Sequence, residues 1–143
     1  MFASFPFRTA KKILFGTGMV EQVGPELKSA GATNAAVITD STIREAGWAD
    51  KIQASLDEAG IKSKVWDGSE AEPSVAVGEQ AIDFVRSGGF DSVVGLGGGS
   101  AMDIAKGAAV SLTNEGSIME WIKDGFTNPL APLALCPTTS GTG

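Results

Sequence analysis

The sequence lacks histidine and tyrosine altogether, and its only cysteine is Cys136. Histidine is the side chain used most often as a general acid or base and as a metal ligand. A single cysteine excludes an intrachain disulfide, and without histidine it also excludes a His/Cys metal site. These absences indicate a chain better equipped for binding than for chemical catalysis. We therefore expect neither a catalytic residue nor a metal ligand within it.

Positive charge is also scarce, because 11 Lys and Arg face 17 Asp and Glu, giving a net charge of -6. This balance argues against a broad basic surface for nucleic acid. No apolar run approaches the roughly 20 residues of a membrane span. Pro6 and Arg8 interrupt the N-terminal apolar residues, so no signal-peptide core is present. We expect a one-domain cytoplasmic protein that binds neither nucleic acid nor membrane.

The most informative stretch is DSVVGLGGGSAMDIAK, residues 91–106. A short apolar run, residues 93–96, is typical of a buried parallel strand. The consecutive glycines of residues 97–99 form a turn, and apolar residues at helical spacing follow Ser100. Such a turn leaves the first N–H groups of the helix free for a phosphate or pyrophosphate. Alternatively, the turn is purely structural, with Ser100 and Asp103 closing the helix as a capping box.

Strands and helices alternate along the rest of the chain. Pro25 moves the start of the first helix toward Gly24, and the mixed pattern of residues 61–66 indicates a strand near a sheet edge. Trp48, Trp66 and Trp121 are expected in core packing. The further elements predicted are extended segments within 4–15, helices at 19–30, 42–46, 50–59, 75–87 and 116–123, and strands at 35–39, 61–66 and 133–136. This order predicts an α/β, Rossmann-like fold with a mostly parallel sheet and helices on both faces.

Polar residues follow three of the predicted strands and should meet at one sheet edge. Asp40 ends the strand of residues 35–39, the glycine turn follows the strand of residues 93–96, and residues 138–142 follow the last strand. Asp40 could bind the two hydroxyls of an adenosine ribose or serve as the N-cap of the next helix, and both remain open. The tail could supply donors to a ligand or be a frayed terminus. The acidic loop of residues 67–73 is expected to be solvated.

Four motifs resemble one known family. GGGSAMDIAK at residues 97–106 is similar to the GGGSxxDxAK motif of the iron-containing (group III) alcohol dehydrogenases. PTTSGTG at residues 137–143 is similar to the PTTxGTGSE motif of that family, and FGTG at 15–18 and VITD at 37–40 also match. The motifs occur in the family's order and at its spacing, and the resemblance covers essentially the whole chain.

The resemblance implies that residues 1–143 form an NAD(P)-binding N-terminal domain. Asp40 would bind the adenosine ribose and favour NAD over NADP. The residues implied to hold the pyrophosphate or line the cofactor are Gly97, Gly98, Gly99, Ser100, Asp103, Thr138, Thr139 and Thr142, with Lys106 completing the motif. The family often has Asn before the proline that is Pro73 here, and this chain has Glu72 instead. That departure puts a contact from this loop in question.

The resemblance also implies a parent protein more than twice as long. Its C-terminal helical domain would bind iron or zinc through an Asp and three His, none of which this chain contains. We expect a truncated domain, inactive alone, of a homo-oligomeric enzyme that transfers hydride between a small alcohol or aldehyde and NAD. The alternatives are a stand-alone nucleotide- or phosphate-binding module without redox activity, and the N-domain of an enzyme related to glycerol dehydrogenase or dehydroquinate synthase.

Overall fold

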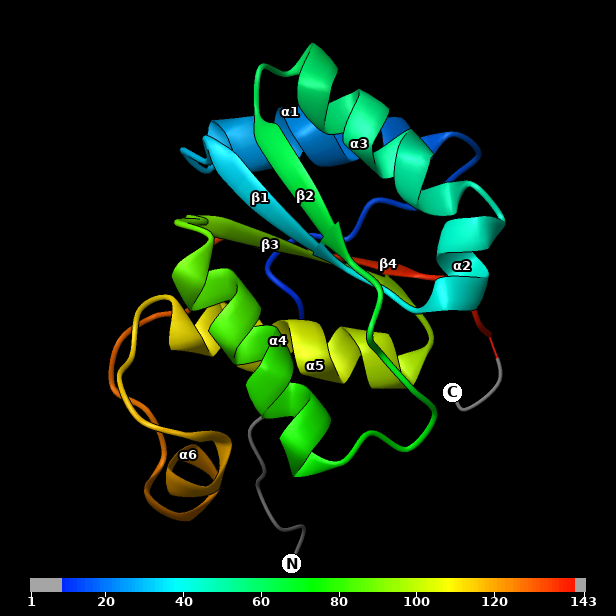
Figure 1. Cartoon of the computed structure of the whole chain (residues 1–143). Coiled ribbons are helices and arrows are strands. Elements are labelled where there is room, and N and C mark those ends of the chain that lie inside the picture. Colours follow the sequence, from blue (N-terminus) through cyan, green and yellow to red (C-terminus); the bar gives the residue numbers. More distant parts are fainter. Residues whose placement is uncertain (1–8, 141–143) are drawn as a thin grey trace, which may run out of the picture.

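A single parallel sheet forms the centre of the computed structural model, which describes residues 9–140 (Figure 1). The strands lie in the order β2-β1-β3-β4, and every neighbouring pair is parallel. Their bounds are Asn34–Ile38 for β1, Lys62–Trp66 for β2, Ser92–Gly97 for β3 and Leu133–Pro137 for β4. All four predicted strands are confirmed, and the carboxyl ends of β1, β3 and β4 meet at one edge.

Helices cover both faces of the sheet. Figure 1 shows α1 and α3 on one face, α4 and α5 on the other, and α2 at the carboxyl end of β1. The bounds are Val23–Ser29 for α1, Ser41–Glu45 for α2, Trp48–Glu58 for α3, Val75–Ser87 for α4, Gly99–Ser111 for α5 and Ile118–Asp124 for α6. A 3-10 turn, Met19–Gln22, precedes α1, so the α-helix starts close to Gly24, as Pro25 predicted. The predicted Rossmann-like α/β fold is confirmed.

Two apolar layers hold the sheet between its helices. On one face, Val37 packs with Ile52 and Leu56 of α3, while on the other, Ile38 packs with Val85 of α4 and Ala105 of α5. Neighbouring residues of β1 therefore serve opposite layers, as the alternation of side chains along a strand requires. Every residue of β3 is buried, so this strand is the centre of the core.

The edge position predicted for the strand of residues 61–66 is also confirmed. β2 pairs only with β1, and its residues alternate between exposed and half-buried. Lys62 and Lys64 are exposed on it. Lysines on an edge strand oppose the addition of a strand from another molecule.

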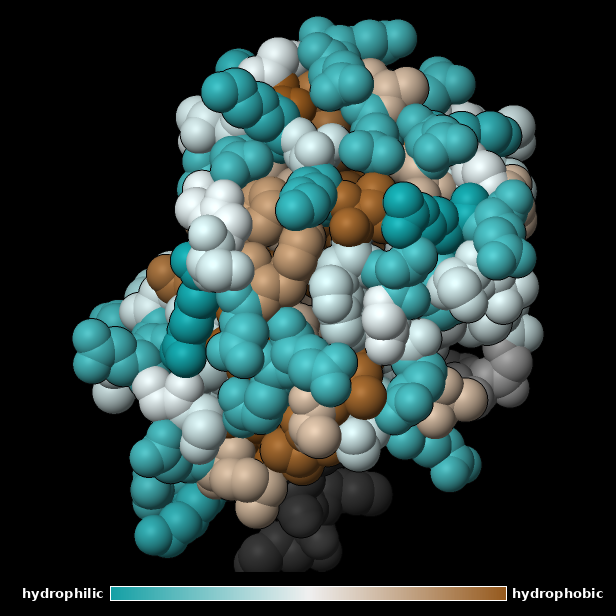
Figure 2. Space-filling model, in the orientation of Figure 1, coloured by the Kyte–Doolittle hydropathy of each residue, from teal (hydrophilic) through white to brown (hydrophobic). Residues whose placement is uncertain are grey.

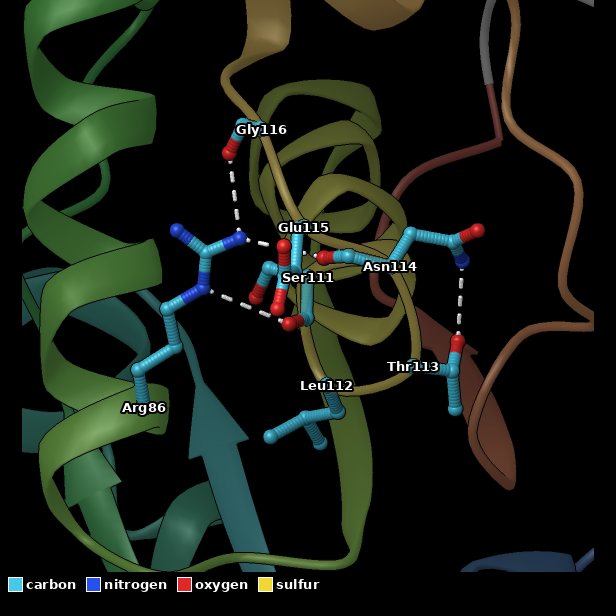
Figure 3. A pocket seen from close by; sticks show the side chains of 7 residues that line it. All are labelled: Arg86, Ser111, Leu112, Thr113, Asn114, Glu115 and Gly116. Carbon is cyan, nitrogen blue, oxygen red and sulfur yellow. Dashed lines mark hydrogen bonds between the residues drawn. The ribbon is translucent and has the colours of Figure 1, made fainter.

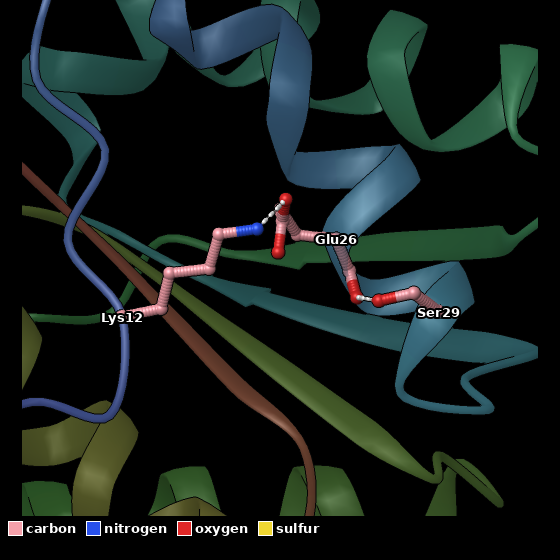
Figure 4. Close-up of polar contacts among 3 residues, drawn as sticks. All are labelled: Lys12, Glu26 and Ser29. Atoms are coloured by element: carbon pink, nitrogen blue, oxygen red, sulfur yellow. Dashed lines mark hydrogen bonds and ion pairs between the residues drawn. The ribbon is translucent and has the colours of Figure 1, made fainter.

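The extended segments predicted within residues 4–15 do not form a strand of the sheet in the part that the structure describes. Residues 1–8 lie outside the described residues, and residues 9–15 contain no strand. Ile13 and Phe15 are 71% and 99% exposed, so neither side chain packs in the core. Its described polar contact is an ion pair between Lys12 Nζ and Glu26 Oε1 of α1, 2.5 Å long (Figure 4). An exposed pair of this kind contributes about 0–1 kcal/mol.

The tryptophans are less buried than predicted. Trp66 and Trp121 are half-buried, and Trp48 is exposed. Trp48 begins α3, where Lys51 Nζ lies 4.2 Å from its ring centroid. A cation above the ring and a position at the end of a helix let this side chain stay at the surface. The prediction of core packing was wrong for Trp48.

A carboxylate clamp joins β1 to the start of β3 at the amino end of the sheet. Asp91 Oδ2 accepts from Thr33 N at 2.9 Å and from Thr33 Oγ1 at 2.5 Å, and Asp91 Oδ1 accepts from Asn34 N at 3.0 Å. Partial burial on its own would raise the pKa of Asp91, but these hydrogen bonds to the ionised form outweigh it and lower the pKa. The ionised carboxylate therefore stabilises the fold.

Replacing Asp91 with Asn should destabilise the protein by about 1–3 kcal/mol near neutral pH, because the charge-assisted bonds are lost. The folded-state pKa of Asp91 is lowered, so its contribution is present above the unfolded-state pKa and disappears as the pH falls through the folded-state pKa. The difference in unfolding free energy between Asp91→Asn and the unchanged protein should thus shrink as the pH falls below the unfolded-state pKa of about 3.9. Urea unfolding at several pH values measures it, and a pH-independent difference would contradict the clamp.

Within residues 9–140, no helix is long and apolar enough to cross a membrane.

Candidate functional site

The glycine turn lies where β3 ends and α5 begins. Gly97 has φ 145°, a conformation that favours glycine, and Gly98 is the N-cap of α5 without a side-chain cap. The first backbone bond of the helix runs from Met102 N to Gly98 O at 3.1 Å. The N–H groups of Gly99, Ser100 and Ala101 therefore have no acceptor within the helix. This end of α5 carries the positive end of the helix dipole, which suits an anion.

The alternative of a capping box at this turn was wrong. Gly98, not Ser100, occupies the N-cap, and Asp103 Oδ1 accepts from Lys106 Nζ at 2.8 Å instead of closing the helix start. A capping box does occur in α6, between Ser117 and Glu120. Both pairs have the three-residue spacing of a capping box, but Ser117 precedes its helix, whereas Ser100 lies within the first turn of α5. Spacing alone does not show this difference.

Asp40 serves as an N-cap and retains a second oxygen for another partner. Its Oδ1 accepts from Ile43 N of α2 at 2.9 Å. Its Oδ2 points toward the glycine turn, since a Cβ added at Gly97 would lie 3.4 Å from that atom. One of the two interpretations left open by the sequence, the cap, is therefore confirmed. Among residues 9–140, no hydrogen-bond donor is assigned to Oδ2, which is compatible with the other interpretation, a ribose hydroxyl.

The segment after β4 joins the same edge. Thr138 N donates to Gly97 O at 2.9 Å, which fastens this segment to the glycine turn. A Cβ added at Gly98 would lie 3.6 Å from Cγ2 and 3.7 Å from Oγ1 of Thr139. The segment is therefore packed beside the turn as far as Thr139. Thr142 lies outside the described residues.

These contacts bring Asp40, the Gly97–Gly98 turn and Thr139 together, as the sequence predicted. Among the described residues, no atom lies within 4 Å of a Cβ added at Gly99. A Cβ added at Gly98 would lie at ordinary contact distance from Thr139. This edge of the sheet combines free N–H donors, a bare backbone and a carboxylate oxygen. Such an arrangement fits the pyrophosphate and ribose of a dinucleotide.

Asp103 lies one turn further along α5 than Gly99 and is not among the contacts that join this cluster. It is exposed and lines a mainly apolar cavity of about 320 Å³ between α4, α5 and α6, together with Pro73 and Trp121. Glu72, beside that cavity, has φ 50°, a left-handed conformation that Asn tolerates better than Glu. Figure 2 shows hydrophobic surface at the nearby end of α4, where Val75 is 44% exposed.

The other end of α5 is anchored by Arg86 of α4. Its guanidinium donates to the carbonyls of Ser111 at 3.3 Å, Asn114 at 3.1 Å and Gly116 at 3.0 Å, in a cavity of about 290 Å³ (Figure 3). These carbonyls occupy Nε and Nη2 of Arg86, and the three hydrogen bonds hold the end of α5 in place. The helix that carries the glycine turn is thus fixed at its far end.

Sequence reasoning missed a pair of charged residues beside Asp40. Arg44 Nη1 of α2 lies 2.8 Å from Asp67 Oδ2, which follows β2. Asp67 is therefore paired as well as partly exposed to solvent, and the expectation of a solvated acidic loop did not include this ion pair. The signal available was its position directly after a strand, at the carboxyl edge of the sheet.

Residues 10–143 match the family described as iron-containing alcohol dehydrogenase. The chain belongs to this family. The predicted resemblance is thereby confirmed.

Relatives within the family are oxidoreductases by name. Long-chain-alcohol dehydrogenase 1 of Geobacillus thermodenitrificans is 40% identical over 132 residues, which are 90% of this chain and 33% of that protein. NADH-dependent butanol dehydrogenase A of Thermotoga maritima has a TM-score of 0.86 at 28% identity, covering 97% of this chain and 35% of that one. Sulfoacetaldehyde reductase of Bifidobacterium kashiwanohense, solved with NAD+, has a TM-score of 0.80 at 26% identity, covering 97% of this chain and 38% of that one. The chain spans about a third of the length of these relatives.

A metal site is a separate question within this family. Among residues 9–140, no group of three His, Cys, Asp or Glu side chains is placed to hold a metal ion. The prediction that the ligands lie in another part of the parent protein stays a prediction.

Proposed function

We propose that this chain is the cofactor-binding part of an NAD-dependent, metal-dependent alcohol dehydrogenase or aldehyde reductase. The observation that carries the proposal is the convergence of Asp40 Oδ2, the glycine turn and Thr139 at one edge of the sheet. Membership of the iron-containing alcohol dehydrogenase family supports it. The NAD+ in the similar sulfoacetaldehyde reductase structure supports the choice of ligand.

Each part of the site has a proposed task. Gly97, Gly98, Gly99 and Ser100 bind the pyrophosphate through the backbone N–H groups at the start of α5. Asp40 keeps α2 capped with Oδ1 and accepts from the ribose hydroxyls with Oδ2. The further proposed cofactor contacts are Asp103, Thr138, Thr139 and Thr142. When bound, the nicotinamide accepts or donates the hydride, and no residue of this chain is assigned a catalytic role.

The rest of the proposal concerns the parent protein. We propose an iron or zinc ion held by residues outside this chain, a small alcohol or aldehyde as substrate, a homo-oligomeric assembly and a cytoplasmic location. The metal would polarise the substrate oxygen during hydride transfer. This chain alone should not turn over an alcohol.

Replacing Asp40 with Ser tests the proposed ribose contact without removing the helix cap, because Ser is also a good N-cap residue. We expect NADH binding about tenfold weaker, from loss of charge-assisted hydrogen bonds, and a smaller NADH preference over NADPH. Fluorescence titration with both cofactors measures the two affinities.

A matched control is Asp57→Asn in α3, which removes one exposed negative charge elsewhere. It should leave both affinities unchanged. If Asp40→Ser shifted NADH and NADPH by the same factor, the ribose role of Asp40 would be contradicted. The turn would then act as a phosphate-binding element alone, which is the alternative function considered from the sequence.

A further inference from the structure

The surroundings of Asp40 contain a fixed arrangement of three charged side chains. The loop after β2 is fastened beside Asp40, because Gly68 forms an antiparallel bridge with Asp40 and Ser69 N donates to Thr39 O at 3.1 Å. Asp67 directly precedes this bridge. α2 leaves from the other side of Asp40, and Arg44 N donates to Asp40 O at 3.0 Å. Arg44 and Asp67 therefore flank the carboxylate from two elements.

Arg44 has the chemistry to change the preference of such a site. Arginine binds phosphate through two parallel N–H donors, and an arginine near the ribose is the usual means of accommodating a 2′-phosphate. Arg44 lies one helical turn along α2 from Asp40, a separation of about 5.4 Å that the arginine side chain can span. A free guanidinium here would therefore oppose the repulsion between Asp40 and a 2′-phosphate.

Asp67 occupies this guanidinium. Arg44 Nη1 and Asp67 Oδ2 are 2.8 Å apart, and their side chains are 52% and 40% exposed. The pair adds little to stability, since exposed ion pairs contribute about 0–1 kcal/mol. Its position beside Asp40 gives it a different consequence. The pair neutralises the one cation placed close to Asp40 by α2, so that Arg44 does not pair with Asp40.

We propose that Asp67 is a positioning residue for cofactor specificity, which holds Arg44 away from a 2′-phosphate and so strengthens the preference for NADH over NADPH. The inference rests on the proposed function and extends it to a second residue. It assigns discrimination to two carboxylates: Asp40 repels the additional phosphate directly, and Asp67 removes the cation that would attract it.

The test is a double-mutant cycle on Asp67→Asn and Arg44→Gln, with fluorescence titration of NADH and NADPH for each protein. Asp67→Asn should tighten NADPH binding by up to about fivefold, because Arg44 is released from an exposed ion pair worth about 0–1 kcal/mol and becomes free for the phosphate, and should change NADH binding by less than about twofold. Adding Arg44→Gln to Asp67→Asn should abolish the gain. Asp57→Asn is the charge-matched control and should change neither affinity.

The outcomes separate this inference from the proposed function. If NADPH tightened equally in Asp67→Asn and in the double variant, the gain would come from lost negative charge alone, and the inference would be wrong. If Asp67→Asn tightened both cofactors by the same factor, it would also be wrong. Failure of the unchanged protein to bind NADH would overturn the proposed function and the inference with it. Thermal unfolding of each variant should be almost unchanged, as expected for an exposed pair.

Discussion

Replacing Gly98 with valine should weaken NADH binding at least about 100-fold while the protein stays folded. Gly98 has φ −78° and ψ −172°, which any residue adopts, so a side chain causes no backbone strain there. A Cβ at this position meets Thr139 at an ordinary 3.6 Å. The branched side chain would instead fill the space above the first N–H groups of α5, where the pyrophosphate is proposed to bind.

The matched control for this prediction is Gly107→Ala in the same helix. Gly107 has no heavy atom within 4 Å of an added Cβ. Alanine there should stabilise α5 by about 0.5–1 kcal/mol without affecting cofactor binding. Isothermal titration with NADH and circular dichroism separate binding from folding. A Gly98→Val protein that binds NADH normally would show that the turn is only structural.

Replacing Gly95 with valine should destabilise the fold by about 3 kcal/mol, the upper part of the range for overpacking. A Cβ at Gly95 would lie 2.7 Å from Ala105 Cβ, 2.8 Å from Leu135 Cδ2 and 3.5 Å from Met102 Cα. Gly95 is buried in the central strand, and Ala105 is fully buried in α5. The strand and the helix therefore have no space for a larger side chain.

The consequence for function follows from the same contacts. If α5 is pushed away from β3, the glycine turn at its start moves relative to Asp40 and Thr139. Gly95→Val should thus lose cofactor affinity together with stability, in contrast to Gly98→Val, which loses affinity alone. Urea unfolding measures the first effect, with Gly107→Ala again as the control. Equal stability of Gly95→Val and the unchanged protein would contradict the close packing of α5 on β3.

Much of this arrangement was predictable because it depends on local patterns. Short continuous apolar runs predicted β1, β3 and β4, and the alternating pattern of residues 61–66 predicted β2 and its edge position. The rule that ligands bind at the carboxyl ends of parallel strands predicted that Asp40, the glycine turn and Thr139 would meet. Contacts of the added Cβ positions at Gly97 and Gly98 agree with this prediction.

The remaining features depend on distances between segments that are remote in sequence. Arg44 and Asp67 are 23 positions apart, and only the sheet order β2-β1 brings α2 and the loop after β2 together. Gly24 is another example, since an added Cβ there would lie 2.0 Å from Ser55 O across the α1–α3 contact. The prediction of a capping box at Ser100 and Asp103 was wrong for a different reason. The spacing of Ser100 and Asp103 was compatible with a cap, but the helix begins at Gly99.

The proposed dinucleotide site is tested most directly by a fluorescence titration of the unchanged chain with NADH and with NADPH. The position of Asp40 Oδ2 beside the glycine turn predicts saturable binding of NADH and weaker binding of NADPH, because a carboxylate repels the 2′-phosphate. Tighter binding of NADPH would contradict the role of Asp40 and leave the pyrophosphate site in place. Binding of neither cofactor would contradict the proposed dinucleotide site itself.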